Sequence, residues 1–161
     1  MITLIKNVEM LHHLSHEYSI IGLTKTKIKI DSCSVLNTNL LGYKFISQPS
    51  FSDAGGVGFY INDNLSFIIR SDISQSTVEF EALWIEVPSN LHQNIIFGVV
   101  YRHPRSATSS FLTYLSDTLE KIRQENKICI LLGAFNLNLL NFETHSDTHV
   151  FINILSSYFY S

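Results

Sequence analysis

The chain has 161 residues, of which 45% are hydrophobic and 16% are charged, and its formal net charge is −3. This length suits one domain with a single core, and we expect one domain over residues 1–161. The charged fraction lies below the roughly 25% of a typical soluble domain, which excludes a disordered tail or a coiled coil and predicts a tendency to aggregate. A net negative charge disfavours strong nonspecific binding of nucleic acid.

Cysteine content and hydrophobic run lengths bear on the compartment. The two cysteines, Cys33 and Cys129, are too few and too far apart in the sequence for the disulfide framework of a small secreted domain. The N-terminus lacks the pattern of a signal peptide, and no run of about 18 apolar residues occurs. We therefore expect an intracellular protein, nuclear or cytoplasmic, that is neither secreted nor inserted in a membrane.

The N-terminal part predicts a helix followed by a strand. Apolar residues recur at helical spacing over residues 2–17, which is typical of a short amphipathic helix. Residues 18–23 are apolar and rich in β-formers, so we predict a central strand that is buried on both faces.

Residues 42–101 predict an antiparallel meander, because short strand-like segments alternate with turn residues that tolerate positive φ. The glycines of the GGVG segment, residues 55–58, are interpreted as a hairpin turn. They are not expected to cradle a phosphate, since a strand and not a helix follows them. The predicted strands are residues 42–47, 57–62, 66–71, 79–87 and 94–101.

The C-terminal part returns to alternating helix and strand. Residues 108–126 carry apolar side chains at helical spacing, with Ser109 or Ser110 as the expected cap. A buried strand is predicted over residues 127–133 and a second amphipathic helix over residues 147–160. This order of elements predicts an α/β sandwich with mixed sheets.

Reactive groups in open α/β folds collect beyond the carboxyl ends of buried strands. Three segments occupy such places here: residues 24–26 after the first strand, residues 101–104 at the end of the meander and residues 134–136 after the last strand. We therefore expect the functional residues in these three segments.

The same segments carry a family resemblance, in five blocks that occur in one order. Together they resemble the endonuclease/exonuclease/phosphatase superfamily, in particular the endonuclease domains of non-LTR (LINE-type) retrotransposons, which accompany a reverse transcriptase. The resemblance implies a DNase I-like fold: two mixed, largely antiparallel β-sheets flanked by helices, here expected to be incomplete at both ends. The blocks are IIGLTKTKI (20–28), AGGVGFYI (54–61), EALWIEV (81–87), IIFGVVYRHP (95–104) and LLGAFNLNLL (131–140).

The resemblance also implies magnesium-dependent cleavage of phosphodiester bonds in DNA. Two positions depart from the family pattern: Lys25 stands where the family has its main metal-binding Glu, and Ala134 stands where it has the Asp that activates water. Tyr101 and Asn136 keep the family's neutral hydrogen-bonding groups at the catalytic site.

Both departures oppose that chemistry. A divalent ion 4 Å from the Lys25 ammonium would meet about 8 kcal/mol of repulsion at an effective dielectric of 20. Ala134 has no proton acceptor, and general-base assistance is typically worth about 10² to 10⁴ in rate. We therefore expect no bound magnesium in this chain.

Each residue also has a simpler interpretation. Lys25 would fit an ordinary solvated loop lysine, Tyr101 a sheet-edge residue and Asn136 a turn residue after a strand. Arg102 is a weak candidate for a phosphate contact, and a solvated arginine is the alternative.

The resulting hypothesis is a degenerate endonuclease-like domain of retrotransposon origin that is inactive, with weak or no binding to DNA. Two alternatives stay open: an active magnesium-dependent DNA-nicking phosphodiesterase, and a noncatalytic module that binds nucleic acid or protein.

Overall fold

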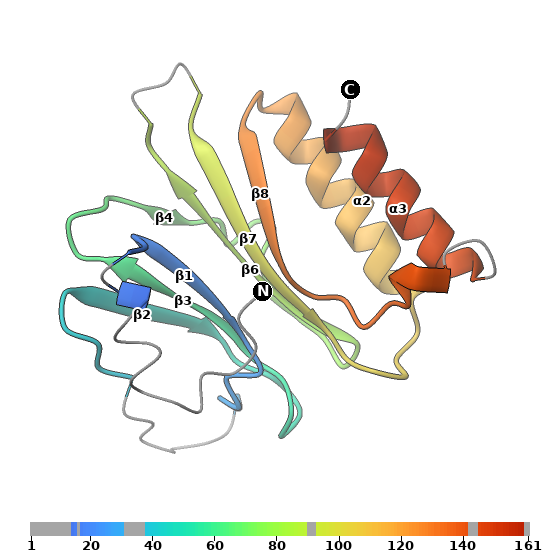
Figure 1. Cartoon of the computed structure of the whole chain (residues 1–161), viewed down its shortest axis with the longest axis horizontal. Coiled ribbons are helices and arrows are strands. Elements are labelled where there is room, and N and C mark those ends of the chain that lie inside the picture. Colours follow the sequence, from blue (N-terminus) through green and yellow to red (C-terminus); the bar gives the residue numbers. More distant parts are fainter. Residues whose placement is uncertain (1–13, 16, 31–37, 90–92, 142–144, 160–161) are drawn as a thin grey trace.

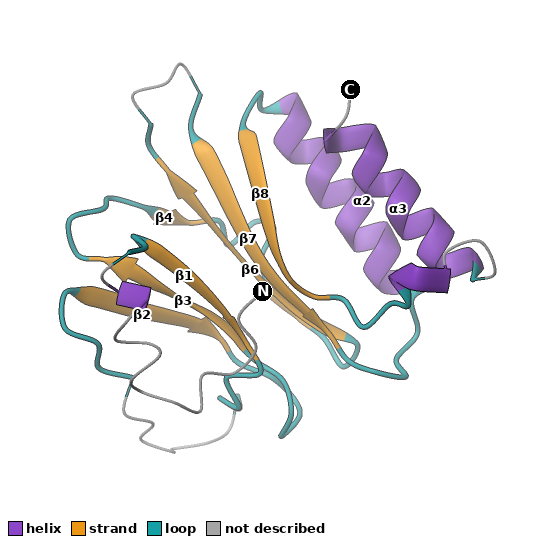
Figure 2. Ribbon diagram, viewed as in Figure 1, coloured by secondary structure: helices purple, strands orange, loops and turns teal. Residues whose placement is uncertain are grey.

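The computed structural model describes residues 14–15, 17–30, 38–89, 93–141 and 145–159. It shows two β-sheets that face each other and two long helices on the outer side of one of them (Figures 1 and 2). Most of the helix predicted over residues 2–17 lies outside the described residues, although Leu14 and Ser15 are helical.

The first sheet is antiparallel and has the order β1-β3-β2. β1 was predicted as a central strand, but among the described residues it pairs with β3 alone. The predicted burial of both faces is confirmed only in part: Ile21 is 2% exposed, whereas Ile20 and Leu23 are half-buried and Tyr18 is 52% exposed. Burial of a strand's faces also does not reveal how many strands pair with it. The strands are β1 (Ile20–Thr24), β2 (Tyr43–Gln48) and β3 (Val57–Asn62).

The second sheet has the order β4-β6-β7-β8, with β5 paired to β6. Its pairs are antiparallel except for β7 and β8, which are parallel. This sheet comprises β4 (Ile68–Ile69), β5 (Gln75–Ser76), β6 (Phe80–Val87), β7 (Ile95–Arg102) and β8 (Ile128–Ala134).

The prediction of one continuous meander is therefore wrong. The chain passes from one sheet to the other between β3 and β4, and this crossing lets both sheets bury an apolar face against each other. The GGVG segment is only partly a turn: Gly55 and Gly56 end the loop between the antiparallel strands β2 and β3, while the next two residues belong to β3. Gly56 has a φ of 88°, which explains the need for glycine there.

Both predicted C-terminal helices are confirmed, as α2 (Ser109–Gln124) and α3 (Ser146–Phe159), and the strand between them is β8. A short 3₁₀ turn (Leu139–Asn141) precedes α3. The N-cap of α2 is Thr108, not one of the predicted serines, and its hydroxyl bonds to the Asp147 carboxylate of α3 instead of capping its own helix. This hydrogen bond links the N-terminal ends of α2 and α3.

Two apolar cores lie on opposite faces of the second sheet. The core between the sheets contains Phe59 of β3, Leu83 and Ile85 of β6, and Val99 and Tyr101 of β7. The core beneath the helices combines Trp84 and Val100 with the buried face of α2, which is formed by Phe111, Leu112, Leu115, Leu119 and Ile122. Residues that alternate along one strand therefore serve different cores, as the two-residue period of a strand requires.

Trp84 packs directly on the backbone of the neighbouring strand. It is fully buried, and its indole donates a hydrogen bond of 2.7 Å to the Tyr114 hydroxyl of α2. A Cβ at Gly98 of β7, which lies opposite Trp84, would come within 2.2 Å of the indole ring. Glycine is therefore required at position 98 because the Trp84 indole lies close to the β7 backbone, and not because of the φ angle.

An ion-pair network joins the second sheet to the end of α2. Arg70 is 8% exposed and contacts Asp72, Glu86 and Glu125 at 2.7–3.0 Å, and Lys127 contacts Glu86 at 2.7 Å. The hydrogen bond from Arg70 holds the pKa of Asp72 well below its usual range, and Lys127 is the main cause that lowers the pKa of Glu86.

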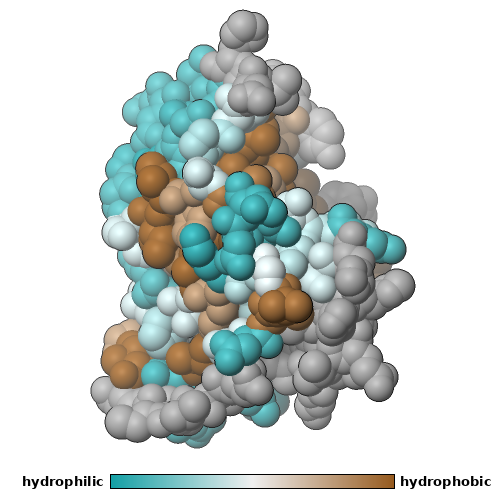
Figure 3. All heavy atoms as spheres, turned by 90° about the vertical axis from the view of Figure 1, so that its left-hand side faces the viewer, coloured by the Kyte–Doolittle hydropathy of each residue, from teal (hydrophilic) through white to brown (hydrophobic). Residues whose placement is uncertain are grey.

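The surface carries apolar side chains between polar ones. Figure 3 shows this mixture on the described part of the face on the side of β2 and β4. Exposed apolar residues include Leu41, Ile68 and Ile69. None of the helices among the described residues combines the length and hydrophobicity needed to span a bilayer.

Candidate functional site

The ends of β1, β7 and β8 come together at one mouth of the space between the sheets. Because β7 and β8 are parallel, their carboxyl ends lie at the same edge, and Tyr101 is paired with Ala134. The Lys25 ammonium lies 5.5 Å from the centre of the Tyr101 ring. The structure thus brings together the three segments that the sequence singled out, although Tyr101 and Arg102 belong to β7 itself and do not follow it.

Lys25 is half-buried in a loop of unusual conformation. Its φ is 58°, and that of Lys27 is 60°, in the left-handed region that non-glycine residues rarely adopt. The loop is held in place because the backbone N–H groups of Thr26 and Lys27 donate to the carbonyls of Gly56 and Gly55. The Lys25 ammonium lies over the Tyr101 ring, in a cation–π arrangement.

Tyr101 is 1% exposed and belongs to the core between the sheets. Burial raises the pKa of its hydroxyl, and the negative charge of Glu81 raises it further, while a hydrogen bond with Asn136 acts in the opposite direction. The hydroxyl is therefore neutral at physiological pH, and it serves as a hydrogen-bonding group and not as a base.

Glu81 is a residue of this mouth that the sequence reasoning missed. It lies opposite Tyr101 on β6, is fully buried, and its Oε1 accepts hydrogen bonds from the Ser50 hydroxyl and from His103 Nε2, the latter at 2.8 Å. Its Oε2 has no hydrogen-bond partner among the described residues. The sequence could have revealed Glu81 by its position in β6. It shares a strand face with Leu83 and Ile85, where a charged residue is unexpected.

Gly55 makes room for this cluster. A Cβ at that position would lie 2.3 Å from the Ser50 hydroxyl, 2.7 Å from Glu81 Oε1 and 2.8 Å from the His103 ring. The Gly55 carbonyl also accepts a hydrogen bond from the backbone N–H of Lys27. The buried carboxyl group and the loop of Lys25 are thereby parts of one packed unit.

Arg102 and Asn136 fasten the loop after β8. Arg102 is 4% exposed, and its guanidinium donates to the carbonyls of Phe135 and Asn136 at 2.7 Å and of Ser106 at 2.9 Å. The Asn136 side chain donates to the Arg102 carbonyl in return. The solvated-arginine interpretation is therefore wrong, and the guanidinium is directed at backbone carbonyls, which leaves the predicted phosphate contact without support.

Ala134 presents a methyl group to the mouth. It is half-buried and packs against the core between the sheets. The preceding Gly133 has a φ of 153°, and a Cβ there would lie 2.0 Å from the Val100 carbonyl oxygen. The strand therefore approaches its neighbour closely just before the position that the family resemblance assigns to the water-activating Asp.

These residues do not fit a magnesium ion, which requires near-octahedral oxygen ligands. Two buried oxygens lack hydrogen-bond partners among the described residues, Thr24 Oγ1 and Glu81 Oε2. Together they offer one carboxylate oxygen and one hydroxyl oxygen, fewer ligands than an octahedral ion needs. In the described part of the chain, no three His, Cys, Asp or Glu side chains gather in a way that could hold a metal ion.

Comparison with known proteins identifies the fold. No family model matches the chain, and no curated protein matches its sequence. Among solved structures, the endonuclease domain of TRAS1, a telomere-specific non-LTR retrotransposon, matches with a TM-score of 0.67 and 11% identity over 97% of this chain and 69% of that domain.

Two further structures have the same architecture. The human Nocturnin catalytic domain with bound sulfate matches with a TM-score of 0.62 and 19% identity, over 92% of this chain and 60% of that domain. The catalytic domain of Xenopus laevis APE2 matches with a TM-score of 0.60 and 16% identity, over 91% of this chain and 61% of that domain. The chain thus has the endonuclease/exonuclease/phosphatase fold and spans about three fifths of these two domains.

Proposed function

We propose that this chain is a degenerate endonuclease-like domain of retrotransposon origin that does not cleave phosphodiester bonds by the metal-dependent route. The observation that carries the proposal is the composition of the mouth, where a lysine ammonium faces Tyr101 and a methyl group stands beside it in β8. The likeness to the TRAS1 domain supports the retrotransposon origin.

Hydrolysis of a phosphodiester needs a group that takes a proton from water and a positive charge that stabilises the transition state. Lys25 supplies a positive charge, but Ala134 supplies no base. Glu81 does not replace it, because its carboxyl group is fully buried and bound to Ser50 and His103. The neutral Tyr101 hydroxyl is not a base either.

The chain's net charge of −3 supports weak binding to DNA at most. The proposal therefore includes no tight complex with nucleic acid. A module that binds protein through another surface is compatible with it.

The test is nicking of supercoiled plasmid in millimolar Mg²⁺ by protein that unfolds cooperatively on heating. We expect no nicking above the buffer background by the natural chain. The double variant Lys25→Glu/Ala134→Asp restores two carboxylates, and we expect it to gain saturable Mg²⁺ binding in calorimetry.

Lys27→Glu provides the matched control, because Lys27 lies in the same loop at a similar φ but is exposed. We expect this variant to bind no more Mg²⁺ than the natural chain. Nicking by the natural chain at a rate that rises with Mg²⁺ would overturn the proposal.

A further inference from the structure

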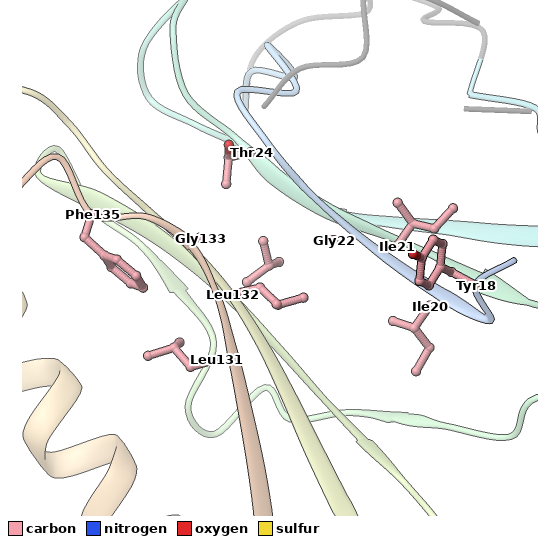
Figure 4. Close-up of a pocket in the computed structure, with 10 residues that line it drawn as sticks. Tyr18, Ile20, Ile21, Gly22, Thr24, Leu131, Leu132, Gly133 and Phe135 are labelled. Atoms are coloured by element: carbon pink, nitrogen blue, oxygen red, sulfur yellow. The ribbon is translucent and has the colours of Figure 1, made fainter. Parts of the chain in front are cut away.

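A cavity of about 280 Å³ lies between β1 and β8. Figure 4 shows Ile20 and Gly22 of β1 on one side of it and Leu131 and Leu132 of β8 on the other, with Phe135 just after β8. The cavity is larger than the roughly 150 Å³ that holds a benzene molecule and slightly smaller than the pockets of about 300 Å³ and more that hold drug-sized ligands. It therefore has room for a molecule with one or two rings.

The cavity is narrow and can be reached from solvent. An added Cβ at Gly22 would lie 3.1 Å from Leu132 Cδ1 and 3.6 Å from Val99 Cγ2, so its walls come close together there. This shape favours a flat ring over a branched group. Two of the lining residues are partly exposed, Tyr18 at 52% and Leu132 at 38%. A small molecule can therefore enter while the chain stays folded.

The walls favour a neutral ligand. Most of the side chains that line the cavity are aliphatic or aromatic, and none of the described residues around it is charged. An ion that entered would lose its hydration without gaining a partner of opposite charge. The cavity therefore excludes phosphates, carboxylates and metal ions.

Thr24 supplies a polar group at the end of β1. Its side chain lines the cavity and is 3% exposed, and its Oγ1 has no hydrogen-bond partner among the described residues. A buried hydroxyl without a partner is unfavourable. Because no hydrogen bond among the described residues fixes the χ1 angle of Thr24, rotation about χ1 can turn the hydroxyl toward a ligand. Thr24 therefore marks the place where a polar group of the ligand would bind.

We propose that the cavity between β1 and β8 binds a neutral molecule with one aromatic ring and one hydroxyl group, that is, a phenol. The ring lies between the apolar side chains of the two strands, and the phenol hydroxyl forms a hydrogen bond with Thr24. Pockets for small molecules commonly have this combination of apolar walls and a few polar groups. The inference does not rest on the proposed function, and the nicking measurement does not bear on it.

The experiment compares two probes of nearly equal shape, 4-methylphenol and toluene, which lacks the hydroxyl. Each is titrated into the natural chain, and the NMR shifts of the Ile20 and Leu132 methyl groups give the dissociation constant. We expect 4-methylphenol to bind about tenfold more tightly, because toluene leaves the Thr24 hydroxyl without a partner. Equal affinities, or the absence of saturable shifts at these methyl groups, would overturn the proposal.

Thr24→Val removes the hydroxyl and keeps the branched shape, so this variant should bind both probes as weakly as the natural chain binds toluene. Thr113→Val is the matched control, since Thr113 is exposed on α2, and it should keep the preference for 4-methylphenol. Gly22→Val adds volume at the narrow point and should weaken both probes alike. A preference for 4-methylphenol that persists in Thr24→Val would contradict the role of this hydroxyl.

Thermal unfolding without a probe provides a separate readout and shows whether each variant folds. We expect Thr24→Val to unfold at the same temperature as the natural chain or at a higher one, because the variant loses a buried hydroxyl that has no partner in the described part of the chain. A lower unfolding temperature would show that the hydroxyl is already bonded within the chain, and the assignment to a ligand would then fail.

Discussion

At the residue scale, the buried carboxyl group of Glu81 accepts hydrogen bonds from two side chains. Ser50 and His103 donate to one of its oxygens, and Gly55 leaves the space that this arrangement needs. Hydrogen bonds to charged groups contribute more than neutral ones, and their loss leaves buried donors unsatisfied. The cluster therefore fixes the loop that faces Lys25.

Glu81→Ala is expected to lower the free energy of unfolding by about 1–3 kcal/mol, because His103 and Ser50 lose their acceptor in a buried site. Urea unfolding measures this change. Glu79→Ala, two residues away at a half-buried position, is the control and should have a smaller effect. Equal stability of the two variants would show that the cluster is not stabilising.

The approach of Lys25, Tyr101 and Ala134 was predictable, since each stands at a strand end and the strand ends share one edge of the fold. The environment of Glu81 was not predictable, because its partners Ser50 and His103 lie 31 and 22 residues away in the sequence. The burial of Arg102 was hidden for a similar reason: its acceptors are carbonyls of the loop after β8, 33 and 34 residues away.

At the element scale, the pairing of β6 with β7 depends on the contact between Trp84 and Gly98. The indole occupies the space that a side chain on β7 would fill, and its N–H is satisfied by Tyr114 of α2. One residue thus joins two strands and a helix, and the packing tolerates no added volume.

Gly98→Ala is expected to destabilise the chain by about 1–3 kcal/mol, since overpacking forces the ring or the strand to move. Chemical denaturation gives the free energy. Near-ultraviolet circular dichroism should change with it, because Trp84 is the single tryptophan. A variant with unchanged stability and an unchanged spectrum would contradict this contact.

The two C-terminal helices and the long strands were predicted within a few residues, because their apolar periodicity is set locally. The division of the meander between two sheets was not predicted. The alternation of apolar and polar residues along a strand is the same whichever sheet the strand joins. The strand predicted over residues 66–71 is shorter in the structure, where β4 comprises two residues. A turn begins at Arg70, because its carbonyl accepts hydrogen bonds from the backbone N–H groups of Ile73 and Ser74.

At the scale of the whole molecule, the Arg70 network links β4, β6 and the end of α2, and its carboxylates make stability depend on pH. The pKa values of Asp72 and Glu86 are lower in the folded chain than their ordinary values of 3.8 and 4.5. The unfolded chain then binds more protons as the pH falls through this range, so the stabilisation is present at neutral pH and is lost on acidification.

Urea unfolding between about pH 7 and pH 3 should show this loss, and Glu86→Gln should make the dependence shallower because it removes one of the shifted groups. Asp117→Asn, at an exposed position of α2, should leave the slope as in the natural chain. If Glu86→Gln and the natural chain lose stability in parallel, the network does not account for the acid sensitivity.

The two cores on opposite faces of the second sheet also separate two optical signals. Trp84 belongs to the core beneath the helices, while Tyr101 belongs to the core that ends at the mouth. Fluorescence of the single tryptophan will therefore follow global unfolding, yet it will be nearly blind to a molecule that docks against Lys25. Because the chain has seven tyrosines, an encounter at the mouth is better followed by the ultraviolet difference spectrum of the chain compared with that of a Tyr101→Phe variant, which isolates one chromophore.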